Sequence, residues 1–166
     1  MSIVLDIAKT YVRPSEVQAQ RMAGPPREDR ALAVLIAACV LIFVGQWPRL
    51  SREAFLDPTI AIDARMAGAL FAWVLMMPLV FYALALVLHG VMRLMGRETT
   101  GFRVRMALFW ALLASTPLWL LSGLMLGFAG PGLGSYIISG MTFGSFLIFT
   151  VIGLIAAAQN TQEAAL

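Results

Sequence analysis

Four long stretches without a formally charged residue dominate the pattern of this chain. They are Ala31–Trp47, Met66–Met92, Met106–Gly127 and Leu133–Ala158. A helix needs about 20 mostly apolar residues to cross the roughly 30 Å hydrocarbon core of a bilayer, and three of the stretches exceed that length. The first has 17 residues, which at about 1.5 Å per residue still cover roughly 25 Å. The pattern therefore predicts an all-α fold, a polytopic transmembrane helical bundle with four spans.

Ahead of the first span, the apolar positions follow a shorter helical repeat. Residues 3–12 carry apolar side chains at helical spacing, with polar residues mainly between them. They predict a short helix that either lies on the cytoplasmic leaflet or packs on the protein's own loops. Pro14 and Glu16 suit the first turn of a second short helix, which Gly24-Pro25-Pro26 would end. The chain then divides into a cytoplasmic tail with an amphipathic helix, a membrane domain and a C-terminal tail, at residues 1–30, 31–158 and 159–166.

The end of the first span carries two signals of a boundary. Trp47 is placed to anchor the helix at the membrane interface, and Pro48 is expected to stop it. The other tryptophans, Trp73, Trp110 and Trp119, are likewise expected to anchor at an interface or to serve packing, more than to hold a pigment or quinone. The following residues, 51–65, mix polar and apolar side chains around a turn. We predict an ordered external loop there, with about one helical turn.

Two prolines lie inside predicted spans. Pro78 in the second span and Pro117 in the third each remove a backbone hydrogen bond and are expected to kink their helices. Ser115 and Thr116 are placed to compensate for the second proline. Such kinks either shape a cavity or only improve packing.

Composition agrees with a membrane protein, and the charge pattern orients it. The 166 residues are 60% hydrophobic and 13% charged, against about 25% charged in soluble domains. Nine of the twelve Lys and Arg residues lie in the N-terminal tail or between the second and third spans. Because such residues concentrate on the cytoplasmic side, both termini are predicted in the cytoplasm, at a bacterial inner membrane. The net charge is +3, and the basic residues lie beside apolar segments. Their positions favour a role in orienting the chain in a bilayer over nucleic-acid binding.

The connection between the second and third spans is a concentrated positive segment. It contains Arg93, Arg97, Arg103 and Arg105. Each basic residue near an anionic lipid surface gains about 1 kcal/mol. This segment either supplies ordinary orientation charge or binds a specific lipid or partner. Membrane lipids, anionic ones included, are therefore expected partners.

Small residues recur at four-residue spacing in the last two spans. Gly123 and Gly127 form a GxxxG pattern in the third span, and Gly140 and Gly144 form another in the fourth, where Ser139 follows the same spacing from Ser135. Small side chains allow helices to approach closely. These positions are predicted to serve packing inside the monomer or contact with a partner.

The spans offer little catalytic or metal-binding chemistry. His89 lies near the cytoplasmic end of the second span, where an interface residue or a helix C-terminal cation is expected. Cys39 is the only cysteine, so the chain can form neither an internal disulfide nor a CxxC site. The sequence has no phosphate-binding P-loop, HExxH motif or dinucleotide fingerprint. We therefore predict a protein that is not an enzyme and holds no metal or cofactor.

Two segments resemble the bacterial branch of the Yip1-domain family. One is GPPREDRAL at residues 24–32, followed by a short span that ends in QWPRL; the other is TGFR at 100–103, which leads into LFWALLASTP at 108–117. The second is similar to the Yip1 segment in which a glycine-and-phenylalanine turn opens a helix carrying a proline. The resemblance covers most of residues 1–128 and implies a small multispanning protein with a cytoplasmic N-terminus and no known catalytic residues. Eukaryotic members are linked to Rab GTPases and vesicle traffic, and Yip1 domains usually have five spans, whereas four are predicted here.

Two functions remain from these observations. The leading hypothesis is a non-enzymatic accessory or scaffolding subunit in a larger inner-membrane complex, acting through helix–helix and lipid contacts. Its protein partner would be another membrane subunit or a second copy of the chain. The alternative is a transporter or permease component that moves a small solute between the two proline-containing helices, past Ser115, Thr116 and Ser122.

Overall fold

The computed structural model describes residues 3–23, 25–97 and 99–163, and the regular elements in these residues are all helical. Two short helices come first, and the long helices follow; their bounds are α1 Ile3–Val12, α2 Pro14–Met22, α3 Glu28–Leu56, α4 Ile62–Leu70, α5 Met77–Leu94, α6 Gly101–Phe128 and α7 Leu133–Glu163. A π-helical segment, η1 at Phe71–Met76, joins α4 to α5 without a break. Gly24 of the predicted hinge and residues 164–166 of the predicted C-terminal tail lie outside the described residues.

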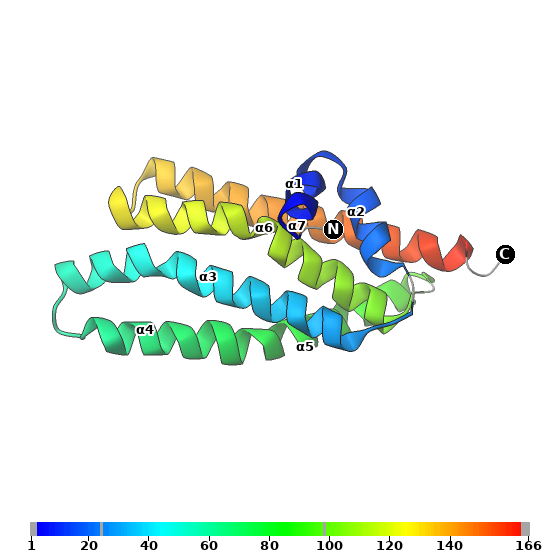
Figure 1. Ribbon diagram of the computed structural model, residues 1–166, viewed down its shortest axis with the longest axis horizontal. Helices are drawn as coiled ribbons and strands as arrows, with labels where there is room; N and C mark the ends of the chain where they lie inside the picture. Colours follow the sequence, from blue (N-terminus) through cyan, green and yellow to red (C-terminus); the bar gives the residue numbers. More distant parts are fainter. Residues whose placement is uncertain (1–2, 24, 98, 164–166) are drawn as a thin grey trace.

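Four helices in the described part of the chain are long and apolar enough to cross a membrane: α3, the continuous α4–η1–α5, α6 and α7. They lie alongside one another in a bundle (Figure 1). The starts of α3 and α6 and the ends of α5 and α7 lie at the same end of this bundle. Six basic residues lie in or next to these helix ends, against three toward the other end; the six are Arg27, Arg30, Arg93, Arg97, Arg103 and Arg105. The predicted fold class is confirmed, as an all-α bundle with four candidate spans and a short N-terminal helix, and the chain is a multi-pass membrane protein.

The predicted stop at Pro48 was wrong. Helix α3 continues through this proline to Leu56, so the predicted loop at 51–65 shrinks to residues 57–61 before α4 begins. The side chain of Arg49 bridges the turns around the proline, with Nε 3.1 Å from Gln46 Oε1 and Nη1 2.6 Å from Glu53 Oε1. Packing on α6 also holds the helix across the proline, because the Pro48 ring lies against Gly127.

Of the two hydroxyls predicted to compensate for Pro117, that of Thr116 does so, whereas that of Ser115 bonds a different carbonyl. A proline lacks the N–H that would bond the carbonyl four residues earlier, which here is Leu113. Thr116 Oγ1 donates to that oxygen over 2.8 Å, and Ser115 Oγ donates to the Leu112 carbonyl over 2.8 Å. Helix α6 changes direction near its middle (Figure 1). In the second span, Pro78 follows directly on η1, at the start of α5.

The core of the bundle is centred on the first half of α6. Six consecutive residues of this half, 106–111, have no exposed surface. Among the fully buried side chains, those of Trp110 and Phe109 are the largest. Helices α3, α5 and α7 pack against α6, and so do α1 and α2. Trp110 is therefore a core residue rather than an interface anchor, and the two short N-terminal helices belong to the packed body of the protein.

Candidate functional site

The GxxxG pattern of α6 forms a close contact with α3. A Cβ atom added at Gly123 would overlap the Gly45 carbonyl oxygen and lie 2.8 Å from its carbon. One added at Gly127 would lie 2.7 Å from the Pro48 carbonyl carbon. Real Cβ atoms do not approach that closely. Of the two alternatives for these glycines, the structure therefore brings both into packing inside the monomer, where they let two spans meet backbone to backbone.

The GxxxG pattern of α7 faces away from the bundle. A Cβ atom added at Gly140 or Gly144 would meet no other atom within 4 Å. Large apolar side chains next to these glycines are also exposed, including Met141 and Phe143. Ser139, which shares their spacing, faces inward and lies 2.9 Å from Ser122, oxygen to oxygen. The outer face of α7 is thus a shallow strip of small residues bordered by exposed apolar side chains.

A small cavity of about 170 Å³, with several polar groups in a mostly apolar lining, lies between α3, α6 and α7. Its lining includes Gln46, Trp119, Ser122, Ser139 and Thr142. The Thr142 hydroxyl is 3.1 Å from the Leu118 carbonyl oxygen, across the α6–α7 contact. The buried indole Nε1 of Trp119 has no hydrogen-bond partner. Ser115 and Thr116, which were predicted to line a solute path, donate their hydroxyls to carbonyl groups within α6 instead.

The N-terminal hairpin, formed by α1 and α2, is fixed to α6 by a buried polar network. Thr10 accepts a hydrogen bond from the indole of Trp110 over 3.1 Å and donates to the Asp6 carbonyl over 2.7 Å. Arg21 pairs with the Asp6 carboxylate, and its guanidinium carbon lies 4.2 Å from the centre of the Trp110 ring. Both charged side chains are close to fully buried, at 11% and 8% exposure. The ion pair, the cation–π contact and the hydrogen bonds together tie α1 to α2 and both to the core.

Two further side chains of the hairpin reach carbonyl groups of the spans. Tyr11 donates its hydroxyl to the Ala114 oxygen over 3.0 Å, and Gln18 Nε2 donates to the Phe149 oxygen over 2.9 Å. Tyr11 also stacks edge-on against Phe149, with ring centres 5.2 Å apart. Burial raises the pKa of Tyr11, which keeps its hydroxyl protonated as a donor. Gly153 makes room for Gln18, since a Cβ atom there would lie 2.7 Å from its amide nitrogen.

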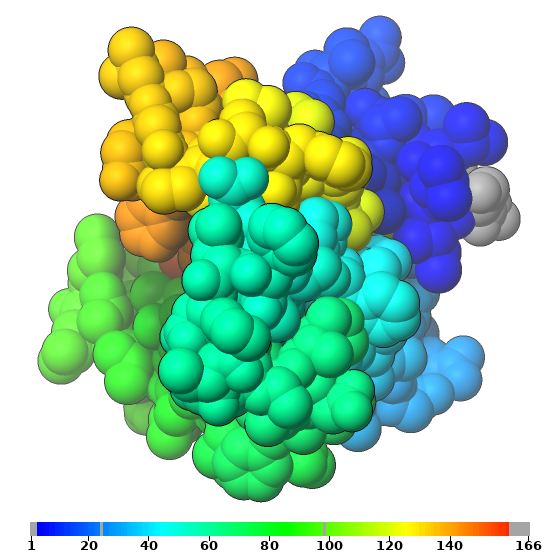
Figure 2. Space-filling model, turned by 90° about the vertical axis from the view of Figure 1, so that its left-hand side faces the viewer, coloured from blue at the N-terminus to red at the C-terminus, as the bar shows by residue number. Residues whose placement is uncertain are grey.

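These contacts decide between the two predictions for residues 3–12. The helix is formed over those residues, and it packs on the protein itself, against the spans α6 and α7 rather than against loops. Figure 2 shows the hairpin standing against one side of the bundle. Sequence reasoning missed Thr10, Gln18 and Arg21 because polar residues in a short tail helix are ordinarily read as solvent-facing.

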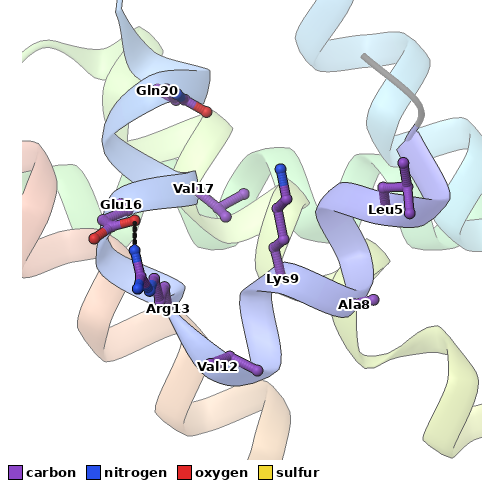
Figure 3. Close-up of a pocket in the computed structure, with 8 residues that line it drawn as sticks. All are labelled: Leu5, Ala8, Lys9, Val12, Arg13, Glu16, Val17 and Gln20. Carbon is purple, nitrogen blue, oxygen red and sulfur yellow. Dashed lines mark hydrogen bonds and ion pairs between the residues drawn. The ribbon is translucent and has the colours of Figure 1, made fainter.

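A groove of about 500 Å³ runs between α1 and α2 (Figure 3). Apolar side chains and charged or polar side chains share its lining; the residues are Leu5, Ala8, Val12 and Val17, with Lys9, Arg13, Glu16 and Gln20. Arg13 pairs with Glu16 over 3.5 Å. A second, more polar cavity of about 360 Å³ is lined by Asp6, Gln20, Arg21 and Arg30. Gln20 lines both.

The predicted positive segment at 93–105 lies at the end of the bundle where α5 ends and α6 begins. Arg93 and Arg97 are exposed. Arg105 pairs with Glu28, with Nε 3.1 Å from Oε2, and so joins α6 to the start of α3. Thr100 caps α6 by accepting a hydrogen bond from the Arg103 backbone amide over 3.4 Å.

The opposite end carries its own charged contacts. Arg65 pairs with Asp57 over 3.2 Å and with Glu53 over 3.8 Å. Hydrogen bonds from the hydroxyl and amide of Thr59 lower the pKa of Asp57, and Arg65 lowers it further. Trp47, predicted as an anchor, lies near this end of α3, 46% exposed.

Among the described residues, no group of three or more His, Cys, Asp or Glu side chains could hold a metal ion. Cys39 is fully buried in α3. His89 is half-buried in α5, where its Nδ1 has no hydrogen-bond partner. No family of known proteins, no curated protein and no solved structure matches the chain.

Proposed function

We propose that this protein is a non-enzymatic accessory or scaffolding subunit of a bacterial inner-membrane complex, with both termini in the cytoplasm. It acts through helix–helix and lipid contacts. The Yip1-like segments at 24–32 and 100–117 support a place in that family as part of the same proposal. The distribution of basic residues between the two ends of the bundle supports the orientation.

The observation that carries the proposal is the contrast between the two GxxxG patterns. Gly123 and Gly127 are used inside the monomer, where an added Cβ would overlap α3. Gly140 and Gly144 have open space before them. Close approach of a second helix is what small residues at this spacing allow in a membrane, where van der Waals packing drives association. The outer face of α7 therefore suits a transmembrane helix of another subunit or of a second copy.

The second span adds to this picture. In the α4–η1–α5 helix, 17% of the most apolar window is buried inside the bundle, against 39–44% for the other three candidate spans. Its outward side chains, such as Leu79, Leu86 and Val87, are 61–72% exposed. The helix packs along one side of the bundle and presents most of its surface to lipid or to a neighbour.

Substitution of the α7 glycines tests the proposal. Gly140→Leu and Gly144→Leu should reduce the size of the complex extracted in mild detergent and the amount of co-purifying protein. Gly90→Leu is a matched control, because a Cβ at Gly90 in α5 also meets open space. Unchanged size and unchanged co-purifying proteins in both α7 variants would contradict the proposal.

A second candidate function is a transporter or permease component for a small solute. The cavity between α3, α6 and α7 favours it, because its lining includes the Ser122–Ser139 pair and the unpaired indole nitrogen of Trp119. Glycerol entry into proteoliposomes, followed by light scattering, tests this function. A transporter predicts protein-dependent entry that Ser139→Leu blocks, and equal rates in protein-free vesicles would refute it.

A further inference from the structure

The N-terminal hairpin docks beside the membrane-spanning part of α6, away from its charged end. Its contacts on α6 are at Trp110 and Ala114, inside the charge-free stretch that begins at Met106. Ala114 is eight residues beyond Met106, a distance of roughly 12 Å along a helix that rises 1.5 Å per residue. The hairpin therefore lies at the depth of lipid acyl chains, in the leaflet nearer the start of α6.

The outer face of α1 agrees with that depth. Its polar residues Asp6 and Thr10 are buried against the bundle, while Val4, Leu5 and Val12 are 72%, 61% and 79% exposed. A helix in water would show the reverse arrangement. Exposed apolar side chains next to spanning helices are the expected contact surface for acyl chains.

The groove between α1 and α2 runs from the turn between the helices toward their other ends. At the turn, Thr10 bonds Trp110 and Tyr11 reaches Ala114, and the Arg13–Glu16 pair lines the groove. Figure 3 shows the side chain of Lys9 extending into the groove toward the other end, where Leu5 and Gln20 lie.

Unpaired cations lie in and beside this end of the groove. The structure gives Lys9 and Arg30 no ion pair among the described residues, whereas Arg13 and Arg21 are paired. Arg30 lines the adjoining polar cavity, which shares Gln20 with the groove. A groove that places the apolar side chains of Leu5, Ala8 and Val17 beside an unpaired lysine is complementary to an anionic phospholipid.

We propose that this groove binds an acyl chain of an anionic phospholipid, whose phosphate lies between Lys9 and the cavity lined by Arg30. Leu5, Ala8 and Val17 contact the chain, and the Lys9 stem packs along it while its ammonium group reaches the phosphate. The groove volume of about 500 Å³ lies within the range of about 300–1,000 Å³ that is usual for ligand sites. The inference rests on the membrane-embedded role proposed above but not on the protein contact of α7, so the two can fail separately.

Native mass spectrometry of the delipidated full chain in detergent tests the site. Dioleoyl phosphatidylglycerol and dioleoyl phosphatidylcholine are titrated in turn, and the affinity of the first bound lipid is compared. Wild-type protein should prefer phosphatidylglycerol. Lys9→Gln should weaken its binding about fivefold, since a basic residue near anionic lipid contributes about 1 kcal/mol. Arg93→Gln, which removes an exposed cation at the same end of the bundle, should change binding less than twofold.

A second pair of variants tests the groove itself. Ala8→Trp fills the groove and should abolish the first high-affinity lipid, whereas Ala83→Trp on the exposed face of α5 should not. Equal losses in Lys9→Gln and Arg93→Gln would reduce the effect to general surface charge and overturn the site. So would unchanged lipid binding in Ala8→Trp, or equal affinity of wild-type protein for the two lipids. These outcomes leave the association tested through Gly140 and Gly144 unaffected.

Discussion

The α3–α6 contact at Gly123 gives the sharpest prediction of stability. In Gly123→Ala, the new methyl group would overlap the Gly45 carbonyl oxygen and lie 2.8 Å from its carbon. Both obstacles are backbone atoms of α3, so no side-chain rotation relieves the overlap. The two spans must separate or shift, and the contact between Gly127 and Pro48 loosens with them.

The expected cost follows from overpacking. Extra methyl groups in a packed core cost about 1–3 kcal/mol. For a protein of this size, that loss corresponds to a fall of about 3–9 °C in Tm, taking about 3 °C per kcal/mol. Gly140→Ala is the matched control, because it adds the same methyl group to a helical glycine with open space around it. Alanine favours helix by up to about 1 kcal/mol over glycine, so the control should keep or raise its Tm.

Thermal unfolding in one mild detergent, followed by tryptophan fluorescence, compares the two variants directly. The account expects Gly123→Ala to unfold several degrees below Gly140→Ala, with the same helical content at low temperature. Equal Tm values, or a larger loss in Gly140→Ala, would refute the assignment of the α6 glycines to the interior and of the α7 glycines to the outer surface.

Three further predictions concern the hairpin and the loop between α3 and α4. Gly153→Leu should displace Gln18 and expose the hairpin, so trypsin should cut after the N-terminal basic residues faster than in wild type; equal cleavage rates would contradict the docked position. Asp6→Asn leaves the buried Arg21 without its counter-charge and should lower the free energy of unfolding by about 3–5 kcal/mol. This loss is measured as a fall in Tm, which adding Arg21→Gln should partly restore. An unchanged Tm in Asp6→Asn alone would disprove the role of the pair. Thr59→Ala should raise the pKa of Asp57 toward its ordinary value, measured by carboxyl NMR titration. Because that pKa is lowered in the folded protein, the loop contact stabilises at neutral pH and is lost as the pH falls through it; an unchanged pKa in Thr59→Ala would count against the hydrogen bonds as its cause.

Much of the architecture follows from the sequence because apolar length and periodicity are local signals. The charge-free stretches predict the four long helices, and the apolar repeat at 3–12 predicts α1 with the same bounds. Thr116 compensates for Pro117 because both groups lie in one helix turn. The prediction that Pro48 ends its helix failed because the glycine that accommodates its ring, Gly127, lies far along the chain and gives no local signal.

The candidate sites depend on which face each helix turns toward the bundle and on how deeply each residue is buried. The spacing of residues along the sequence does not determine either. The two GxxxG patterns read alike in sequence, and only the packed helices distinguish an inner pair from an outer one. Trp110 looks like an interface residue in sequence, yet it lies under Thr10 and Arg21. The sequence held one signal of the docked hairpin, the amphipathic pattern of α1. Beside a membrane, the apolar side chains of such a helix, such as Val4 and Val12, can face outward while its polar side chains face the protein.

The number and direction of the crossings are the central claim, and thiol labelling tests them most directly. Cys39→Ala removes the only cysteine, and single cysteines are then introduced as Ile60→Cys and Met95→Cys, at positions 49% and 67% exposed at opposite ends of the bundle. A membrane-impermeant maleimide added to intact cells with a permeabilised outer membrane should label Ile60→Cys alone, and both variants should react once the inner membrane is opened. Labelling of both variants in intact cells, or of Met95→Cys alone, would contradict the account.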